Sequence, residues 1–129
     1  MPSIKLRNDP VLEEGRRPMG RKPDKARIRE LNDAFRTTFT GGRVMMTHTV
    51  NEMEPEARAK LIAAVQGFDR FDKGNDPHGE HDFGSIEIDG EKFFFKIEYF
   101  DLAMSQHSID AANPEATIRV LTIMRADEY

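Results

Sequence analysis

The sequence predicts an α+β fold in which helices pack against a small antiparallel sheet. Two segments place apolar residues at the three- and four-residue steps of a helix. A strong two-residue turn signal, Asp89-Gly90, lies between two segments that are expected to be strands. The expected order is helix, strand, helix, strand, strand, helix. With 129 residues and 38% hydrophobic content, the chain suits a single core.

The first half of the domain is expected to contain a helix over residues 24–39, a strand over 43–50 and a helix over 55–69. Asp24 suits the N-cap of the first helix, and Pro55 suits the first turn of the second. Alternation along the strand puts His48 on the same face as three apolar residues. We therefore expect this histidine in the core or at its edge.

The hairpin signal sets a register for the next two strands. If the turn has two residues, Gly84 faces Phe95, whose ring takes the space of the missing side chain. By the same register His81 lies opposite Glu98, within cross-strand contact distance. Asp82 then lies on the core side of the sheet, where it needs hydrogen-bond donors.

The C-terminal segment is expected to be a helix that runs to about Glu128. Asn113 can cap it, Pro114 suits its first position, and Glu115 places an acid in its first turn. Residues 120–123 are also compatible with a strand.

Charge divides the chain into two unequal parts. Residues 1–29 contain nine Lys or Arg against four Asp or Glu, whereas the rest of the chain contains ten against nineteen. We interpret residues 1–23, which include four prolines, as a basic, partly disordered arm, and residues 24–129 as one domain. The arm is a candidate for nucleic-acid contact, although it can equally fold onto the acidic domain.

Composition excludes two kinds of structure. The chain has no cysteine, which excludes disulfides and thiolate metal sites. Its longest apolar block, Leu61–Val65, is far shorter than the roughly 20 residues that span a bilayer. The N-terminus lacks the apolar region of a signal peptide. We therefore expect a soluble, cytoplasmic protein with no membrane partner.

The stretch Asn75–Gly84 is the densest in groups that can do chemistry, with two histidines, three carboxylates, two glycines and a proline. One interpretation is a zinc or iron site with His78, His81 and Glu98 as ligands and Asp76 in reserve. Such a site can produce hydroxide for hydrolysis. A metal-free alternative is a His81–Glu98 pair that acts as a general base or a pH-sensitive contact.

A third interpretation of this stretch is structural. Asp76-Pro77 and Gly79 would set the turns of a rigid loop, because these residue types favour turns for local reasons. If the stretch binds a ligand, the residues expected to contribute are Asp76, His78, Glu80, Asp82 and, just past the third strand, Asp101.

The chain carries the segments NDPHGEHDFG, FKIEYFD and RVLTIM at residues 75–84, 95–101 and 119–124, and it ends in Glu128-Tyr129. These segments resemble a small family of uncharacterised bacterial proteins, common in alphaproteobacteria and catalogued as a domain of unknown function. The resemblance covers about Ile28–Tyr129, and Glu80–Gly84 is its most specific part. The chain departs from the family pattern at Phe94 and Phe95, where a tryptophan is frequent, and at Arg125, where an apolar residue is usual.

The resemblance implies an accessory role in mobile DNA, since family members often occur on plasmids and integrated elements. It supplies no catalytic residues. The leading hypothesis is a small binding or regulatory protein that acts on a protein partner, such as a host-defence or DNA-processing enzyme. The alternative is a metal-dependent hydrolase that uses His78, His81 and Glu98.

Overall fold

The computed structural model describes residues 24–129, and in this range it has three α-helices, four strands and a terminal 3-10 turn. The helices are α1 (Lys25–Thr38), α2 (His48–Asn51) and α3 (Pro55–Gln66). The strands are β1 (Arg43–Met46), β2 (Phe83–Ile88), β3 (Glu91–Phe100) and β4 (Ile118–Arg125), followed by η1 (Ala126–Glu128). The fold is α+β, as predicted. The predicted basic arm and its nucleic-acid contact lie outside the described residues.

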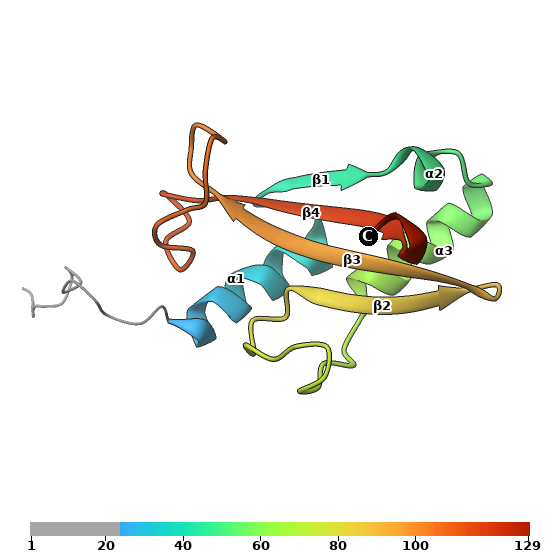
Figure 1. Cartoon of the computed structure of the whole chain (residues 1–129), viewed down its shortest axis with the longest axis horizontal. Helices are drawn as coiled ribbons and strands as arrows, with labels where there is room; N and C mark the ends of the chain where they lie inside the picture. Colours follow the sequence, from blue (N-terminus) through green and yellow to red (C-terminus); the bar gives the residue numbers. More distant parts are fainter. Residues whose placement is uncertain (1–23) are drawn as a thin grey trace, which may run out of the picture.

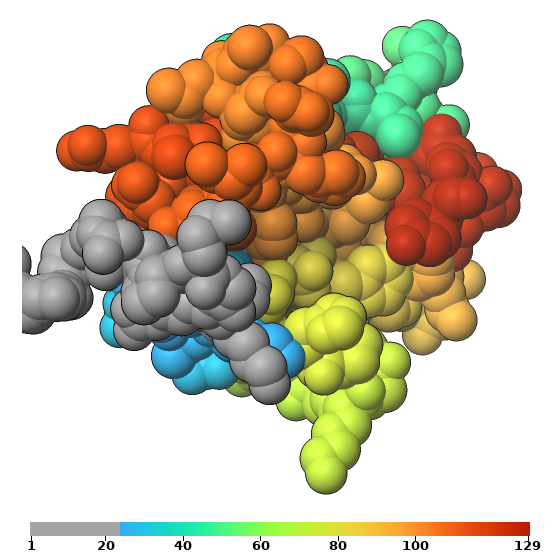
Figure 2. All heavy atoms as spheres, turned by 60° about the vertical axis from the view of Figure 1, so that its left-hand side comes forward, coloured from blue at the N-terminus to red at the C-terminus, as the bar shows by residue number. Residues whose placement is uncertain are grey.

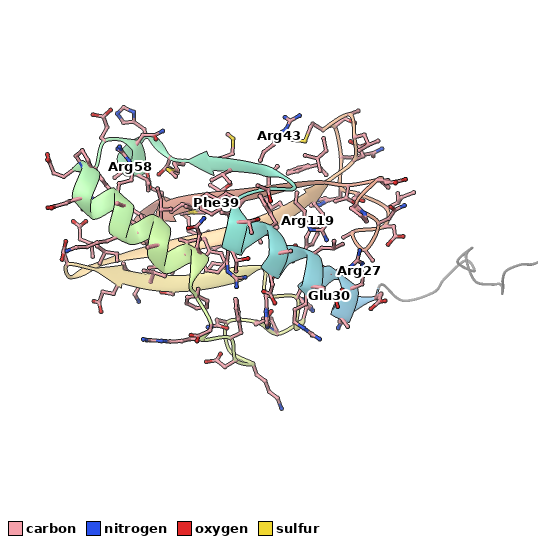
Figure 3. The ribbon with its side chains drawn as sticks, turned by 180° about the vertical axis from the view of Figure 1, so that it is seen from behind. Arg27, Glu30, Phe39, Arg43, Arg58 and Arg119 are labelled. Carbon is pink, nitrogen blue, oxygen red and sulfur yellow. The ribbon has the colours of Figure 1, made fainter. Side chains whose placement is uncertain are left out.

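The four strands form one mixed sheet in the order β1-β4-β3-β2. β1 runs parallel to β4, whereas the β4–β3 and β3–β2 pairs are antiparallel. Helices α1 and α3 lie on one face of the sheet, behind it in Figure 1 and in front of it in Figure 3. None of the helices in residues 24–129 has the length and apolar character needed to cross a membrane.

The two longer helices begin where their local sequence predicts. Asp24 caps α1, because its side chain accepts a hydrogen bond from the amide of Arg27 at 3.0 Å. Phe39 ends α1 in a left-handed conformation with φ of 60°. Pro55 occupies the first turn of α3, where its missing N–H leaves no intrahelical bond unmade. The two helices predicted in the first half of the domain are therefore confirmed, although α3 ends at Gln66 and not near residue 69.

The core lies between these helices and the sheet. Its fully buried side chains include Phe35 of α1, Leu61 of α3, Phe93 and Phe95 of β3, and Leu121 of β4. Gly84 of β2 lies against the ring of Phe95. A Cβ at Gly84 would overlap that ring and come within 2.9 Å of Phe68. This confirms the expectation that the Phe95 ring fills the space left by the missing side chain.

The predicted hairpin register is confirmed. Ile86 of β2 pairs with Phe93 of β3, as a two-residue turn requires. Asp89 and Gly90 form that turn with φ of 51° and 83°. Positive φ at both central residues is the requirement of a type I′ turn, whose twist matches that of the flanking strands.

The prediction of a C-terminal helix is wrong. Residues 118–125 form β4, which lies between β1 and β3. Consecutive residues of this strand, Val120 and Leu121, point to opposite faces and both are buried. The apolar run therefore lacks the alternation that marks a half-exposed strand. Asn113 shapes a turn instead, because its side chain accepts a hydrogen bond from the amide of Glu115 at 3.0 Å.

The first strand is shorter than predicted. β1 ends at Met46, and His48 begins α2, where its side chain is exposed. The prediction of a histidine in the core or at its edge is therefore wrong. Val50, two residues further along α2, is the residue of this helix that is fully buried.

Candidate functional site

A polar stripe on α1 holds the predicted site in place. Its members are Arg29, Asn32, Asp33 and Arg36, which share one face of the helix because they are spaced three and four residues apart. Each of them forms a hydrogen bond with residues 68–81. Asn32 and Arg36 are buried. This face of α1 is therefore an interface inside the fold and not a solvated surface.

Three of these hydrogen bonds reach backbone carbonyls: Arg29 donates to Gly79 (3.0 Å), Asn32 to Glu80 (3.0 Å) and Arg36 to Phe68 (3.1 Å). The Arg36 guanidinium also lies over the ring of Phe71, 5.1 Å from its centroid. Together these contacts attach both ends of the loop between α3 and β2 to α1.

His81 is held from three directions. Its Nδ1 lies 2.9 Å and 3.1 Å from the two carboxylate oxygens of Asp33. Its Nε2 lies 3.8 Å from Oδ2 of Asp76. Its ring stacks on Phe71, with centroids 3.8 Å apart and planes 4° from parallel. Asp33 thus orients the imidazole as in a His–Asp dyad, but the second nitrogen faces another carboxylate, where a substrate would have to lie.

Asp76 organises the turn that precedes His81. Its buried carboxylate accepts hydrogen bonds from the amides of Glu80 and His81, at 3.1 Å and 3.0 Å. Its carbonyl accepts a hydrogen bond from the amide of Gly79 at 3.1 Å. Gly79 has φ of 69°, a conformation that glycine adopts at little steric cost. These contacts agree with the structural interpretation, in which Asp76 and Gly79 set turns.

A buried hydrogen-bond network connects this loop to the sheet. Nε of Arg119, on β4, donates to Oδ1 of Asn32 at 2.8 Å, and Figure 3 shows Arg119 beside α1. Nδ2 of Asn32 donates to the hydroxyl of Tyr99 at 2.8 Å. That hydroxyl donates to Oε1 of Glu80 at 2.8 Å. Arg119 also donates to the carbonyl of Ala111.

Burial changes the acidity of two members of the network. Burial, together with the hydrogen bond and charge of Glu80, raises the pKa of Tyr99 well above its ordinary value. The hydroxyl therefore stays protonated and remains a donor. Burial also lowers the pKa of Arg119, an effect that Tyr99 and Glu80 oppose. Arg119 is buried and has no hydrogen bond to a carboxylate within residues 24–129, so the amide oxygen of Asn32 is a main source of its stabilisation.

Asp82 lies where the loop joins the sheet. Its carbonyl accepts a hydrogen bond from the amide of Ile97 at 2.8 Å, so its backbone continues the hairpin register by one residue. Its carboxylate is half-buried, and burial raises its pKa. The negative charges of Glu80 and Asp76 raise it further.

We expect the substitution Asp82→Asn to raise the free energy of unfolding at neutral pH. Because the pKa of Asp82 is raised in the folded state, the folded protein binds this proton more tightly than the unfolded chain does. Ionisation therefore lowers stability as the pH rises through the ordinary pKa of an aspartate to the raised one. Asparagine removes this cost, so the gain should be present at neutral pH and should vanish in acid.

Urea unfolding of both proteins from acid to neutral pH measures this gain. The exposed Asp69 provides a control, because Asp69→Asn should change the free energy of unfolding by no more than about 0.5 kcal/mol. A gain from Asp82→Asn that does not depend on pH, or a loss at neutral pH, would contradict the prediction.

The three predicted metal ligands are not brought together. His81 faces α1, His78 is exposed, and Glu98 lies on β3 with its Oε1 3.7 Å from Nζ of Lys96. Within residues 24–129, no three His, Asp or Glu side chains are grouped so that they could hold a metal ion.

The structure pairs His81 with Asp33 where the sequence predicted a pair with Glu98. The ladder between β2 and β3 begins at Phe83, and His81 has a left-handed backbone with φ of 57°. Strand alternation, on which the prediction rested, therefore ends before His81. The left-handed conformation turns the imidazole toward α1.

Asp101 begins the long loop between β3 and β4. Its carboxylate accepts hydrogen bonds from the amide and the hydroxyl of Ser105, at 3.0 Å and 3.3 Å. The bond from the amide of Ser105 is the largest cause that lowers the pKa of Asp101. The carbonyl of Asp101 accepts a hydrogen bond from the amide of Met104 at 2.9 Å. Asp101 therefore shapes the start of this loop.

Sequence reasoning missed the residues that hold the loop from outside it: Arg29, Asn32, Asp33, Arg36, Tyr99 and Arg119. The available signal was the spacing on α1. Polar residues three, four and seven residues apart share one face of the helix, but such a face is ordinarily solvated, so the spacing alone does not show that it packs against other polar groups. Which groups those are depends on segments about 50 residues away in the sequence.

Comparison with known proteins gives one family. Residues 46–128 match the family model described as "Protein of unknown function (DUF3768)". The matched region runs from the end of β1 to η1 and so includes the whole loop between α3 and β2, but not α1. No curated protein and no solved structure matches the chain. The match confirms the resemblance to an uncharacterised domain family.

Proposed function

We propose, for a chain that belongs to the DUF3768 family of proteins of unknown function, a role as a cytoplasmic protein-binding module. One observation carries the proposal. The loop between β3 and β4, residues 101–117, is fixed by its own hydrogen bonds and yet exposes large apolar side chains. The resemblance described above implies an accessory role in mobile DNA. The proposed partner is accordingly a host-defence or DNA-processing enzyme.

The first half of the loop is tied to the end of β3. Phe100 and His107 form an antiparallel bridge, and their rings stack with centroids 5.9 Å apart and planes 9° from parallel. The amide of Asp101 donates to the carbonyl of Gln106 at 2.8 Å. Asp101 also holds the turn that follows it through Ser105. This half of the loop therefore has a defined backbone conformation.

The second half is anchored by Thr117. Its buried hydroxyl donates to the carbonyl of Asp110 at 2.9 Å and lies 2.6 Å from the hydroxyl of Ser108. Arg119 reaches the carbonyl of Ala111 and so links the loop to the buried network beneath it. Both halves are held before any partner arrives.

The loop nevertheless exposes three large apolar side chains: Ile109 is 97% exposed, Leu102 is 61% exposed and Met104 is 36% exposed. In the space-filling view the loop forms a raised lobe, coloured orange (Figure 2). These side chains add little to folding, whereas burial of one of them under a partner would contribute about 1.5–3 kcal/mol. A loop fixed in advance also loses little conformational entropy on binding.

The proposal predicts that Leu102→Ser/Ile109→Ser weakens partner binding at least about tenfold and leaves the fold intact. Tagged wild-type and variant proteins would be used to capture proteins from a bacterial lysate, followed by affinity measurement with the captured partner. Met45→Ser is the matched control, because Met45 is 54% exposed but lies on β1. Equal capture by the wild type and the double variant would overturn the proposal.

A further inference from the structure

β2 forms one edge of the sheet, and its outer side is unpaired in the part of the chain that the structure describes. The amide of Ile97 donates to the carbonyl of Asp82, so these residues form a hydrogen-bonded pair of the antiparallel ladder. Backbone groups alternate in direction along a strand. The amides and carbonyls that point away from β3 are therefore those of Phe83, Ser85 and Glu87. None of them has a hydrogen-bond partner within residues 24–129.

The sequence of β2 does little to prevent pairing at this edge. The strand contains no proline and no lysine, and its single charged residue is Glu87. Its pairing with β3 runs without a bulge from Phe83 to Ile88. Prolines, lysines and bulges are the usual devices that keep an edge strand from accepting another chain. The opposite edge, β1, is only four residues long and begins with Arg43.

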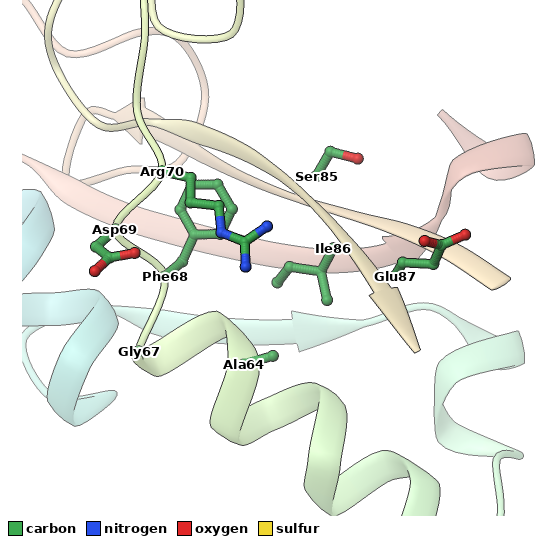
Figure 4. Close-up of a pocket in the computed structure, with 8 residues that line it drawn as sticks. All are labelled: Ala64, Gly67, Phe68, Asp69, Arg70, Ser85, Ile86 and Glu87. Atoms are coloured by element: carbon green, nitrogen blue, oxygen red, sulfur yellow. The ribbon is translucent and has the colours of Figure 1, made fainter. Parts of the chain in front are cut away.

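A cavity of about 410 Å³ lies beside the edge of β2. It is lined by Ala64 of α3, by Phe68 and Arg70 of the loop that follows, and by Ser85, Ile86 and Glu87. In Figure 4, Ile86 points toward α3, and Arg70 extends beside Phe68 toward Ile86. A chain that lay along β2 would therefore have this cavity beneath one of its faces.

The charges around the cavity select the side chains of such a chain. Arg70 is exposed and forms no ion pair within residues 24–129. Asp69, which also lines the cavity, lies on the other side of the loop from the Arg70 guanidinium in Figure 4. A carboxylate on the cavity side can accept two N–H groups of Arg70. Glu87 points to the opposite face from Ile86, so it would meet a basic side chain there.

We infer that an extended peptide segment of a partner protein adds to β2 as a fifth strand. Its backbone pairs with the outward amides and carbonyls of β2. An acidic side chain on the cavity side binds Arg70, and an adjacent basic residue, which points to the other face, pairs with Glu87. The site is separate from the loop 101–117, so this inference does not depend on the function proposed above.

A second copy of this chain fits the edge less well. Two β2 strands paired about a two-fold axis normal to the sheet would place both Arg70 side chains on the same face of the joined sheet. Neither copy would supply a carboxylate in the required place on the cavity side, because the strand residues that point there are Gly84, Ile86 and Ile88. Charge complementarity therefore favours a different chain with an acidic residue at this position.

Selection of short random peptides displayed on phage against the full chain tests the inference. Enriched sequences should alternate in polarity and carry an acidic residue next to a basic one. A synthetic copy of an enriched peptide should have an affinity for the Ser85→Pro variant that is at least about tenfold lower than its affinity for the Ser85→Ala variant. Proline removes an outward amide but is tolerated on an edge strand, whereas alanine keeps the amide. When the Arg70→Glu variant is the target of the same phage selection, the enriched peptides should carry a basic residue at the position where the wild type selected an acidic one.

Hydrogen exchange on the wild-type chain provides a measurement that does not depend on a variant. Bound peptide should slow exchange of the amides of Phe83, Ser85 and Glu87. The inference is overturned if no peptide is enriched, if these amides are not slowed, or if Arg70→Glu leaves the acidic preference unchanged. It is also overturned if the wild type sediments as a dimer that Ser85→Pro dissociates, since the edge would then bind a second copy.

Discussion

Replacement of Asn32 by alanine is expected to lower the free energy of unfolding by about 3–5 kcal/mol, which is a large part of the stability of a small domain. Asn32 is fully buried and serves three partners: the guanidinium of Arg119, the hydroxyl of Tyr99 and the carbonyl of Glu80. Alanine would leave the buried charge of Arg119 without its side-chain acceptor. Removal of an acceptor from a buried, charged donor costs more than the hydrogen bond itself contributed, because the freed N–H stays desolvated.

Unfolding in guanidinium chloride, followed by circular dichroism, measures this loss of stability. Asn51→Ala is the control, because Asn51 is exposed and, within residues 24–129, its side-chain amide donates a single hydrogen bond, of 3.3 Å, to the carbonyl of Met46. That variant should lose less than about 1 kcal/mol. If the two variants lose the same amount, the network does not contribute as argued.

Replacement of Phe95 by alanine is expected to cost about 3–5 kcal/mol as well, through a cavity in the core. Phe95 is fully buried, and its ring contacts Phe68 edge-on, with centroids 5.2 Å apart. The neighbouring Gly84 makes the result sharper. Gly84→Ala alone should cost about 1–3 kcal/mol, because its Cβ would overlap the Phe95 ring.

In the Phe95→Ala background the same Gly84→Ala substitution should cost much less, because the methyl group enters space that the ring has left. A double-mutant cycle measured by chemical denaturation should therefore show a coupling of at least about 1 kcal/mol. Additive losses would mean that the close contact between Gly84 and Phe95 does not decide the choice of glycine.

The sequence was informative wherever a local rule has few solutions. Asp24 and Pro55 located the starts of α1 and α3, because caps and first-turn prolines act within a few residues. The Asp89-Gly90 pair established the register of β2 and β3, because a two-residue turn leaves no freedom in the pairing. The close approach of Gly84 and Phe95 followed from that register alone.

The sequence was ambiguous where the same pattern suits two environments. Buried apolar residues lie on both faces of β4: Leu121 and Ile123 on the core face, and Val120 and Met124 on the other. A run of this kind has no period that separates a strand from a helix. Similarly, the strand alternation of β2 does not reach back to His81, because this residue has a left-handed backbone.

The sequence by itself therefore determined the fold class, the two main helices, the hairpin register and the position of the dense polar stretch at residues 75–84. Only the tertiary structure decided what that stretch contacts. His81 pairs with Asp33. Glu80 accepts a hydrogen bond from Tyr99, which in turn is bonded to Asn32, and Asn32 is bonded to Arg119. The physical reason is that a cap or turn is set by neighbouring residues. The partner of a buried polar group, in contrast, is set by the packing of helices and strands that lie far apart in the sequence.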